Sequence, residues 1–453
     1  MEQGLSARVA VKGAPDRKMA LADRMAFHQV PAVSIAVVNQ GRIEWARAYG
    51  VVDATTRDPV TTATRFQAAS ISKAVSAIGA LHLVEQGKLS LDADANTQLT
   101  AWKIPQNAYT EGNKITLRQL LNHSAGTTVH GYGGYSSKQA LPTLLNVLDG
   151  TPPATSPPVR VDIAPGTTWR YSGGGYSIIQ LMVTEASKQP FARYMQSAVL
   201  GPLGMTRSTY DVISPGQRRD VPATAHDGSG KPIDGRWHTY PESAAAGLWT
   251  TPTDLARVVI EVQQAEAGQS HKVLSRAMTS TMLTRVLGEY GLGFFVEKLA
   301  DRTSFSHSGG NEGFRTQLYG YTQTGQGVVV MTNGDNGAAL IDEILCSVAA
   351  EYGWPEFRVV EKTAIAPDAD MNRRVAGEYR LVEKPAYVVA EGERLYFQSE
   401  LFGSKRMELF RESKSAFFMT AQDMTIRFEQ EGDGAAAGFS LVRGSNTYPG
   451  TRK

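Results

Sequence analysis

The sequence has a single cysteine, Cys346, among 453 residues, so no disulfide bond can form within the chain. Apolar residues recur at helical spacing over residues 340–350, which favours a buried structural thiol over a reactive one. The eight histidines are scattered without metal-ligand spacing, and the sequence contains no HExxH pattern. We therefore expect neither a metal site nor any other cofactor.

The chain also has little net charge and no long hydrophobic run. Lys and Arg total 46 and Asp and Glu total 44, with the two signs interleaved along the chain. This balance gives no electrostatic reason to expect a nucleic acid or an anionic membrane as partner. No run is apolar enough to span a bilayer, and residues 1–18 lack the apolar stretch of a signal peptide. We expect a cytoplasmic protein, or a periplasmic or secreted one if a leader has been removed.

The chain is long enough for a large domain and a smaller one, and its 42% hydrophobic and 20% charged content is that of a globular protein. Helical or strand-like patterns occur at residues 20–28, 32–38, 42–50, 70–86, 117–122, 176–186, 253–259, 305–309 and 327–332. The two strands around residues 39–41 predict a hairpin. Together with the later strands, they predict one sheet assembled from both ends of this region, with helices on its faces.

Two regions depart from this pattern. Residues 124–168 have little periodicity, so they predict either a loop at the rim of a binding site or a plain connection, with about even weight. After residue 360, Met424, Ile426 and Phe428 alternate with polar residues. Such alternation is typical of short antiparallel strands and predicts a small barrel or sandwich.

The first candidate catalytic pattern is Ser70-Ile71-Ser72-Lys73 at the predicted start of a helix. Residues three apart share one helix face, so Lys73 can reach the Ser70 hydroxyl. A serine attacks well only when a base removes its proton, and burial can lower the pKa of a lysine enough to make it that base. The alternatives are a helix-capping serine and a solvated lysine.

A second pattern, Trp169-Arg170-Tyr171-Ser172 followed by Gly173 to Gly175, lies about a hundred residues later. Tyr171 could project its phenol into a cleft, and a phenolate held near Ser70 by Lys73 could carry the proton. Glycine residues let a backbone approach a ligand closely. The alternative is a glycine turn beside a core tyrosine.

The third pattern is His307-Ser308-Gly309-Gly310 at the end of a strand-like run. Small residues on an edge strand allow a substrate backbone to pair with the strand. The Gly310 N–H could then donate to an oxyanion, together with an N–H at the start of the Ser70 helix. His307 could instead be an ordinary core or surface histidine.

Together, these patterns resemble the class C β-lactamases, D-alanyl-D-alanine carboxypeptidases, D-aminopeptidases and family VIII esterases over roughly residues 20–355. The matching segments are Ser70-x-x-Lys73, Leu120 to Gly126 (similar to LLxHTSG), Pro165-Gly166 ahead of Tyr171-Ser172-Gly173, Ala245 to Leu255, and His307-Ser308-Gly309 in place of Lys-Thr-Gly or His-x-Gly. The resemblance implies acyl transfer in which Ser70 attacks, Lys73 and Tyr171 exchange the proton, and the Ser70 and Gly310 N–H groups bind the oxyanion.

The resemblance also implies the fold, an α/β (α+β) architecture with a β-lactamase/transpeptidase-like catalytic domain over residues 1–358. Its antiparallel sheet would be flanked by helices and a helical subdomain. Residues 359–453 resemble the small lipocalin-like all-β barrel that follows the catalytic domain in some D-aminopeptidase-type members. There the barrel limits access to the cleft or mediates assembly, so shielding of the site and a homo-oligomer are expected here.

Two residues depart from the family pattern. Gly173 stands where the family usually has an asparagine that touches a substrate amide, and His307 stands where a lysine would meet a substrate carboxylate. A histidine is mostly uncharged at neutral pH, which weakens such an anchor. We therefore expect an esterase or D-amino-acid-type amidase acting on small substrates. The alternatives are a penicillin-binding sensor that acylates without turnover, a weak β-lactamase, and, with little weight, a non-catalytic interaction protein.

Overall fold

The computed structural model describes residues 2–15, 18–213, 221–299, 301–382, 384–399, 406–429, 434–444 and 446–453. Contacts within the chain divide it into two compact units. One is Pro31–Asp335, and the other joins Met1–Val30 to Asn336–Lys453. The domain boundary expected at residue 358 remains a prediction.

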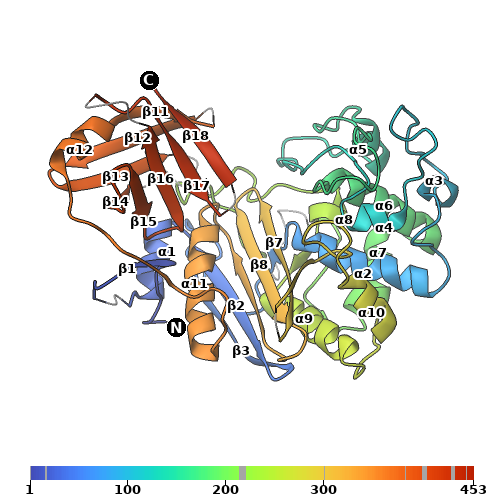
Figure 1. Cartoon of the computed structure of the whole chain (residues 1–453). Coiled ribbons are helices and arrows are strands. Elements are labelled where there is room, and N and C mark those ends of the chain that lie inside the picture. The colour runs from blue at the N-terminus through green and yellow to red at the C-terminus, as the bar shows by residue number, and fades with distance from the viewer. Residues whose placement is uncertain are drawn as a thin grey trace. The chain divides into compact units, whose positions relative to one another are not determined.

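The unit Pro31–Asp335 is built on a six-stranded antiparallel sheet with the order β3-β2-β9-β8-β7-β6 (Figure 1). Its strands are β2 (Ala32–Asn39), β3 (Arg42–Gly50), β6 (Phe295–Lys298), β7 (Thr303–Asn311), β8 (Phe314–Tyr321) and β9 (Gly327–Thr332). The predicted hairpin is confirmed as β2 and β3. Because β2 also pairs with β9, strands from both ends of the unit form one sheet, as expected.

Helix α9 (Pro252–Glu266) packs against β2, β8 and β9 of this sheet. The remaining elements of the unit lie mainly between β3 and β6 in the sequence. They are β4 (Phe66–Gln67), α2 (Ile71–Glu85), α3 (Ala95–Gln98), α4 (Leu117–Leu121), α5 (Leu144–Asp149), α6 (Gly173–Ser187), α7 (Phe191–Met195), the π-helix η1 (Gln196–Leu200), α8 (Ser243–Ala246), β5 (Trp249–Thr250) and α10 (Arg276–Met282). These helices form the predicted helical subdomain.

Helix α2 is the central helix of this subdomain, and it packs against α6 and α8. Nearly all its residues are buried, since it is apolar on every side rather than along one stripe. Gly79 permits its close packing, because a Cβ there would lie 2.5 Å from Met195 Sδ. A buried, rigid helix therefore carries Ser70 at its first turn.

The second unit contains two helices and a short parallel pair of strands before its barrel. The helices are α1 (Leu21–His28) and α11 (Gly337–Tyr352), and the strands are β1 (Val9–Val11) and β10 (Val360–Lys362). Glu343 on α11 is fully buried and accepts hydrogen bonds from Arg24 and His28 on α1. Cys346 is buried as predicted, and burial raises the pKa of its thiol.

Eight antiparallel strands after α12 (Ala369–Val375) form a closed barrel, which confirms the predicted small all-β barrel. The strands are β11 (Gly377–Leu381), β12 (Lys384–Glu391), β13 (Arg394–Ser399), β14 (Met407–Arg411), β15 (Ala416–Met419), β16 (Met424–Glu429), β17 (Gly438–Arg443) and β18 (Asn446–Arg452). They pair in chain order, and β18 closes the barrel on β11. The barrel has a core of its own, in which the rings of Tyr379, Phe397, Phe428 and Phe439 contact one another.

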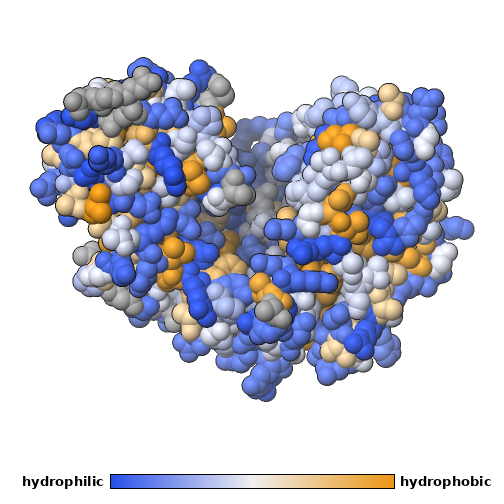
Figure 2. Space-filling model, in the orientation of Figure 1, coloured by the Kyte–Doolittle hydropathy of each residue, from blue (hydrophilic) through white to orange (hydrophobic). Residues whose placement is uncertain are grey.

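On the face drawn in Figure 2, hydrophobic residues form small patches separated by hydrophilic ones. Scattered apolar residues of this kind are normal on a protein surface. Across the described part of the chain, no helix is both long and apolar enough to cross a membrane.

Candidate active site

Ser70 lies at the junction between an extended segment and α2. The preceding residue, Ala69, has a φ of 50°, a left-handed conformation that is costly for a residue with a Cβ. Ser70 occupies the cap position of α2, but its side chain makes no capping hydrogen bond. Its hydroxyl instead lies 3.1 Å from Lys73 Nζ. Ser70 is therefore not a side-chain cap, which removes the structural alternative for this residue.

Lys73 is buried, with only 2% of its surface exposed, so the alternative of a solvated lysine is wrong. Its Nζ donates a hydrogen bond to the backbone oxygen of Ala245, 2.9 Å away on α8. Burial lowers the pKa of Lys73 from 10.5 to about 7. Near neutral pH, a large share of the lysine is therefore an uncharged amine that can accept the Ser70 proton.

Tyr171 completes a cluster with these two residues. Its ring centroid lies 4.9 Å from Lys73 Nζ, and its phenol is close enough to the Ser70 hydroxyl for that group to affect its pKa. Burial raises the pKa of Tyr171 well above its usual value, and the Ser70 hydroxyl opposes this only in part. The phenol is therefore protonated in the resting site, contrary to the expected phenolate. Burial therefore favours the amine form of Lys73 and the protonated phenol of Tyr171.

The glycine run after Tyr171 forms the first turn of α6, not a turn beside a ligand. Ser172 caps this helix, because its Oγ accepts a hydrogen bond from the Gly175 N–H at 3.0 Å. A Cβ on Gly173 would lie 3.0 Å from the ring of Tyr132, whose hydroxyl is held 2.7 Å from Ser177 Oγ. The Tyr132 ring thus lies where an asparagine side chain at position 173 would begin.

The third pattern lies on β7, next to Ser70. Strand β6 pairs only with residues 303–306 of β7, and no other described strand pairs with residues 307–311 on that side. Ser308 and Gly310 are exposed along this open edge. Gly309 has a different role, because a Cβ there would lie 2.3 Å from the backbone oxygen of Ala68. Glycine at this position lets β7 approach the segment that precedes Ser70.

His307 is buried, and both of its ring nitrogens have partners. Nδ1 lies 2.6 Å from the backbone oxygen of Ser308, and Nε2 lies 3.0 Å from the hydroxyl of Tyr290. A carbonyl oxygen can only accept, so Nδ1 carries the proton and Nε2 accepts from Tyr290. Burial, followed by the charge of Lys73, lowers the pKa of His307 to about 3. A neutral, fully bonded His307 does not provide a positive anchor for a carboxylate.

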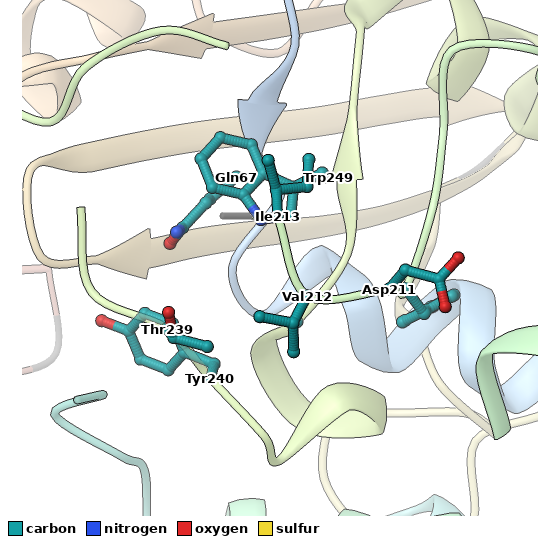
Figure 3. Close-up of a pocket in the computed structure, with 9 residues that line it drawn as sticks. Gln67, Asp211, Val212, Ile213, Thr239, Tyr240 and Trp249 are labelled. Atoms are coloured by element: carbon teal, nitrogen blue, oxygen red, sulfur yellow. The ribbon is translucent and has the colours of Figure 1, made fainter. Parts of the chain in front are cut away.

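A small pocket adjoins α8 and the strand pair β4–β5. Figure 3 shows the side chains of Gln67, Val212, Ile213 and Trp249 around it, with Thr239 and Tyr240 to one side. Gln67 is buried, and its Oε1 accepts a hydrogen bond from Asn311 Nδ2 at 2.6 Å. Asn311 also donates to the backbone oxygen of Ala246. This pocket therefore abuts the segments that hold β7 and Lys73 in place.

Comparison with known proteins identifies the family. Residues 18–345 match the Beta-lactamase family. The chain belongs to this family of serine hydrolases. Penicillin-binding protein 4* of Bacillus subtilis (strain 168) is 26% identical over 435 residues, which cover 90% of this chain and 92% of that protein. Protein flp of Staphylococcus aureus (strain N315) is 25% identical over 67% of this chain, and the match spans 60% of its length.

Solved structures of beta-lactamase-like proteins share the fold. The octameric penicillin-binding protein homologue from Pyrococcus abyssi matches with a TM-score of 0.66 and 20% identity, covering 95% of this chain and 98% of the homologue. The structure of SurE matches with a TM-score of 0.58 and 21% identity over 96% and 97% of the two chains. The D-amino acid amidase from Ochrobactrum anthropi SV3 has a TM-score of 0.58 and 19% identity over 73% and 98%.

The sequence alone predicted no role for two side chains of this site, His123 and Tyr290. His123 lies in the motif at residues 120–126, but no role was assigned to it. Its Nδ1 accepts a hydrogen bond from the Ser172 N–H at 3.1 Å, and its ring centroid is 4.3 Å from that of Tyr171. Tyr290 binds His307, although the sequence around Tyr290 carries no catalytic signal. Both residues are buried, His123 against Tyr171 and Tyr290 against His307.

Proposed function

We propose that this protein hydrolyses small esters or amides that carry no carboxylate, D-amino acid amides among them, through an acyl-enzyme on Ser70. The observation that carries this proposal is the buried Lys73, whose amine lies 3.1 Å from the Ser70 hydroxyl and whose pKa is about 7. A lysine kept largely uncharged beside a serine has the chemistry of a general base.

In the proposed acylation, the Ser70 oxygen attacks the substrate carbonyl while the Lys73 amine takes the hydroxyl proton. The N–H groups of Ser70 and Gly310 stabilise the oxyanion. As the carbon–leaving-group bond breaks, the Tyr171 phenol gives its proton to the leaving atom, and the Lys73 ammonium then reprotonates Tyr171. Water hydrolyses the acyl-enzyme by the reverse sequence of proton transfers.

The preference for substrates without a carboxylate rests on the residues at positions 173 and 307. Both nitrogens of His307 are engaged, so this residue offers no charge to a substrate carboxylate. A Cβ at position 173 would lie 3.0 Å from the Tyr132 ring, so an amide side chain there would require that ring to shift. These features support an esterase or amidase over an efficient β-lactamase. The similarity in fold to the D-amino acid amidase from Ochrobactrum anthropi SV3 supports the amide substrates.

The test is a Ser70→Ala variant assayed on short p-nitrophenyl esters and on D- and L-alanine amide. We expect turnover of the best substrate to fall by a factor of about 10³ or more, since the residual rate then comes only from binding and the oxyanion site. Ser229→Ala, in an exposed turn of the same unit, is the matched control and should keep wild-type activity. Undiminished turnover by Ser70→Ala would contradict the proposal.

A second candidate function is penicillin binding without efficient turnover. It is supported by the similarity to penicillin-binding protein 4*, which extends over 92% of that protein. Intact-mass measurement after incubation with benzylpenicillin separates the candidates. A stable adduct on the Ser70 peptide would favour penicillin binding, whereas no adduct together with ester or amide turnover would favour the hydrolase.

We further propose that residues 359–453 form a separate lipocalin-like domain and that copies of the chain self-associate. The similar protein from Pyrococcus abyssi is described as octameric, which supports the second point. Light scattering coupled to gel filtration should then give a multiple of the 49.0 kDa chain mass. A single species of 49.0 kDa would contradict self-association.

A further inference from the structure

We propose that the site binds the leaving group of its substrate on an aromatic surface made by Trp169 and Phe295, and that the preferred leaving group is an uncharged aromatic alcohol or amine. This inference rests on the proposed hydrolysis through Ser70 and names the substrate class more closely. Its basis is the position of these two rings relative to Tyr171 and His307.

Tyr171 marks the side of the site on which the leaving group lies. Its ring lies 4.9 Å from Lys73 Nζ, which contacts the Ser70 hydroxyl, and in the proposed reaction its phenol gives its proton to the leaving atom. The leaving group must therefore lie against Tyr171. Trp169 precedes Tyr171 by two residues in a non-helical segment, and their ring centroids are 6.5 Å apart. The side chain of the intervening Arg170 binds the backbone oxygen of Gly126 instead.

The aromatic surface continues from Trp169 to the edge of β7. Phe295 on β6 lies 6.2 Å from Trp169 and 5.6 Å from His307, measured between ring centroids. The fully buried Tyr290 contacts both Trp169 and Phe295, at 6.3 and 4.8 Å, and so supports them. Trp169, Phe295 and Tyr171 all keep part of their surface exposed. A cluster of partly exposed rings thus extends from Tyr171 to the edge of β7.

Gly288 contributes to the placement of Trp169. It has a φ of 64°, and a Cβ there would lie 3.3 Å from Trp169 Cγ, so the loop around residue 288 packs directly against the indole ring. Tyr290, two residues later, packs against the same ring. Trp169 is therefore held by its neighbours and would lose little freedom when a substrate ring stacks on it.

The basic side chains next to this edge of β7 are already engaged. Both nitrogens of His307 have partners within the protein. The side chain of Arg315 lies beside Gly310, but its guanidinium group binds the backbone oxygens of Asn311 and Phe314 and the carboxylate of Asp335. Neither His307 nor Arg315 therefore offers an unpaired cation to an anionic leaving group. An uncharged ring gains stacking contacts at no electrostatic cost.

The test compares three acetate esters that share one acyl group: benzyl acetate, ethyl acetate and the anionic O-acetylglycolate. We expect the wild-type protein to have its highest kcat/KM for benzyl acetate and its lowest for O-acetylglycolate. Trp169→Ala should lower the ratio of kcat/KM for benzyl acetate to that for ethyl acetate about tenfold, and Trp169→Phe should retain most of it. Trp45→Ala, which removes a partly exposed tryptophan from β3, is the matched control and should leave the ratio unchanged.

The outcomes separate this inference from the proposed function. Suppose that hydrolysis depends on Ser70. If Trp169→Ala then leaves the ratio of kcat/KM for benzyl acetate to that for ethyl acetate unchanged, or if O-acetylglycolate is the preferred ester, the aromatic subsite is refuted and the hydrolase proposal stands. If Ser70→Ala hydrolyses all three esters as fast as the wild type, both are refuted. If circular dichroism shows that Trp169→Ala does not fold, the same ratio of kcat/KM values is measured for Phe295→Ala, which changes the aromatic surface from β6 instead.

Discussion

Glu242 provides a sharp test of the electrostatics of this site, because it is a fully buried carboxyl group next to α8. Neither of its oxygens has a hydrogen-bond partner within 3.5 Å among the described residues. The polar groups that face it are the hydroxyls of Tyr132, Tyr135 and Tyr240, which come from other segments of the same unit. Burial raises the pKa of Glu242 from 4.5 to about 7, and a weak contact with Tyr135 opposes this only in part.

The sign of the effect on stability follows from this pKa. The folded protein binds the Glu242 proton more tightly than the unfolded chain does, so the free energy of unfolding falls as the pH rises from about 4.5 to about 7. Below pH 4.5 this loss of free energy of unfolding is absent, and above pH 7 it is complete. A pKa shift of this size corresponds to a loss of about 3 kcal/mol. Glu242→Gln cannot ionise and should escape the whole of this loss.

Urea unfolding of the wild type and of Glu242→Gln at about pH 5 and about pH 8.5 measures the effect. The difference in free energy of unfolding between the two proteins should move by about 2.5 kcal/mol in favour of the variant between these pH values. Other carboxyl groups titrate in both proteins and therefore cancel. Glu111→Gln, which removes an exposed carboxyl from the same unit, is the matched control. A difference that stays constant with pH would show that Glu242 ionises without a burial penalty, and the reasoning would fail.

Three further predictions concern the residues around Ser70. The kcat/KM for an uncharged ester should rise with pH around a midpoint of about 7 and level off above it, because the reaction requires the amine form of Lys73. Lys73→Arg should abolish this rise and lower kcat/KM by about 10³-fold or more. Tyr171→Phe should slow the hydrolysis of ethyl acetate about 10²-fold or more, but that of p-nitrophenyl acetate much less, because a nitrophenolate leaves without a proton. Equal losses of rate for the two esters would exclude Tyr171 as the proton donor. Gly309→Ala should lower the melting temperature and the activity together, because its Cβ would lie 2.3 Å from the Ala68 oxygen, and an unchanged melting curve would disprove the close approach of β7.

The Ser70–Lys73 pair could be predicted from the sequence because both residues lie on one helix, where a spacing of three places them on the same face. The burial of Lys73 is also consistent with the sequence, since residues 70–86 are apolar on all sides of the helix and therefore indicate a buried element. Likewise, the alternation around Met424 predicted strands. The alternation alone left a barrel and a sandwich open, and the barrel was expected only from the family resemblance, because its closure joins β11 to β18, about seventy residues apart in the chain.

The glycine run at residues 173–175 shows why the local prediction failed. Three consecutive glycines favour a turn on propensity alone. They form a helix here because the start of α6 packs closely against residues 127–132, where a Cβ on Gly174 would lie 2.6 Å from the Thr128 oxygen. Tertiary packing therefore outweighs intrinsic propensity. The sequence predicted a mostly uncharged His307, but it could not show how strongly burial and the charge of Lys73 lower its pKa, because both depend on the fold.

Burial favours the uncharged form of the titratable groups that the fold places around Ser70. Lys73 has its pKa lowered to about 7, His307 to about 3, and Tyr171 and Glu242 have theirs raised. In the mechanism that we propose, charge develops at the oxyanion and transiently on Lys73 and Tyr171. An anionic substrate would have to lose its water without gaining a partner, which costs several kcal/mol. An uncharged ester or amide avoids that cost. In the function that we propose, the burial that lowers the pKa of Lys73 therefore also disfavours the carboxylate that a β-lactam carries.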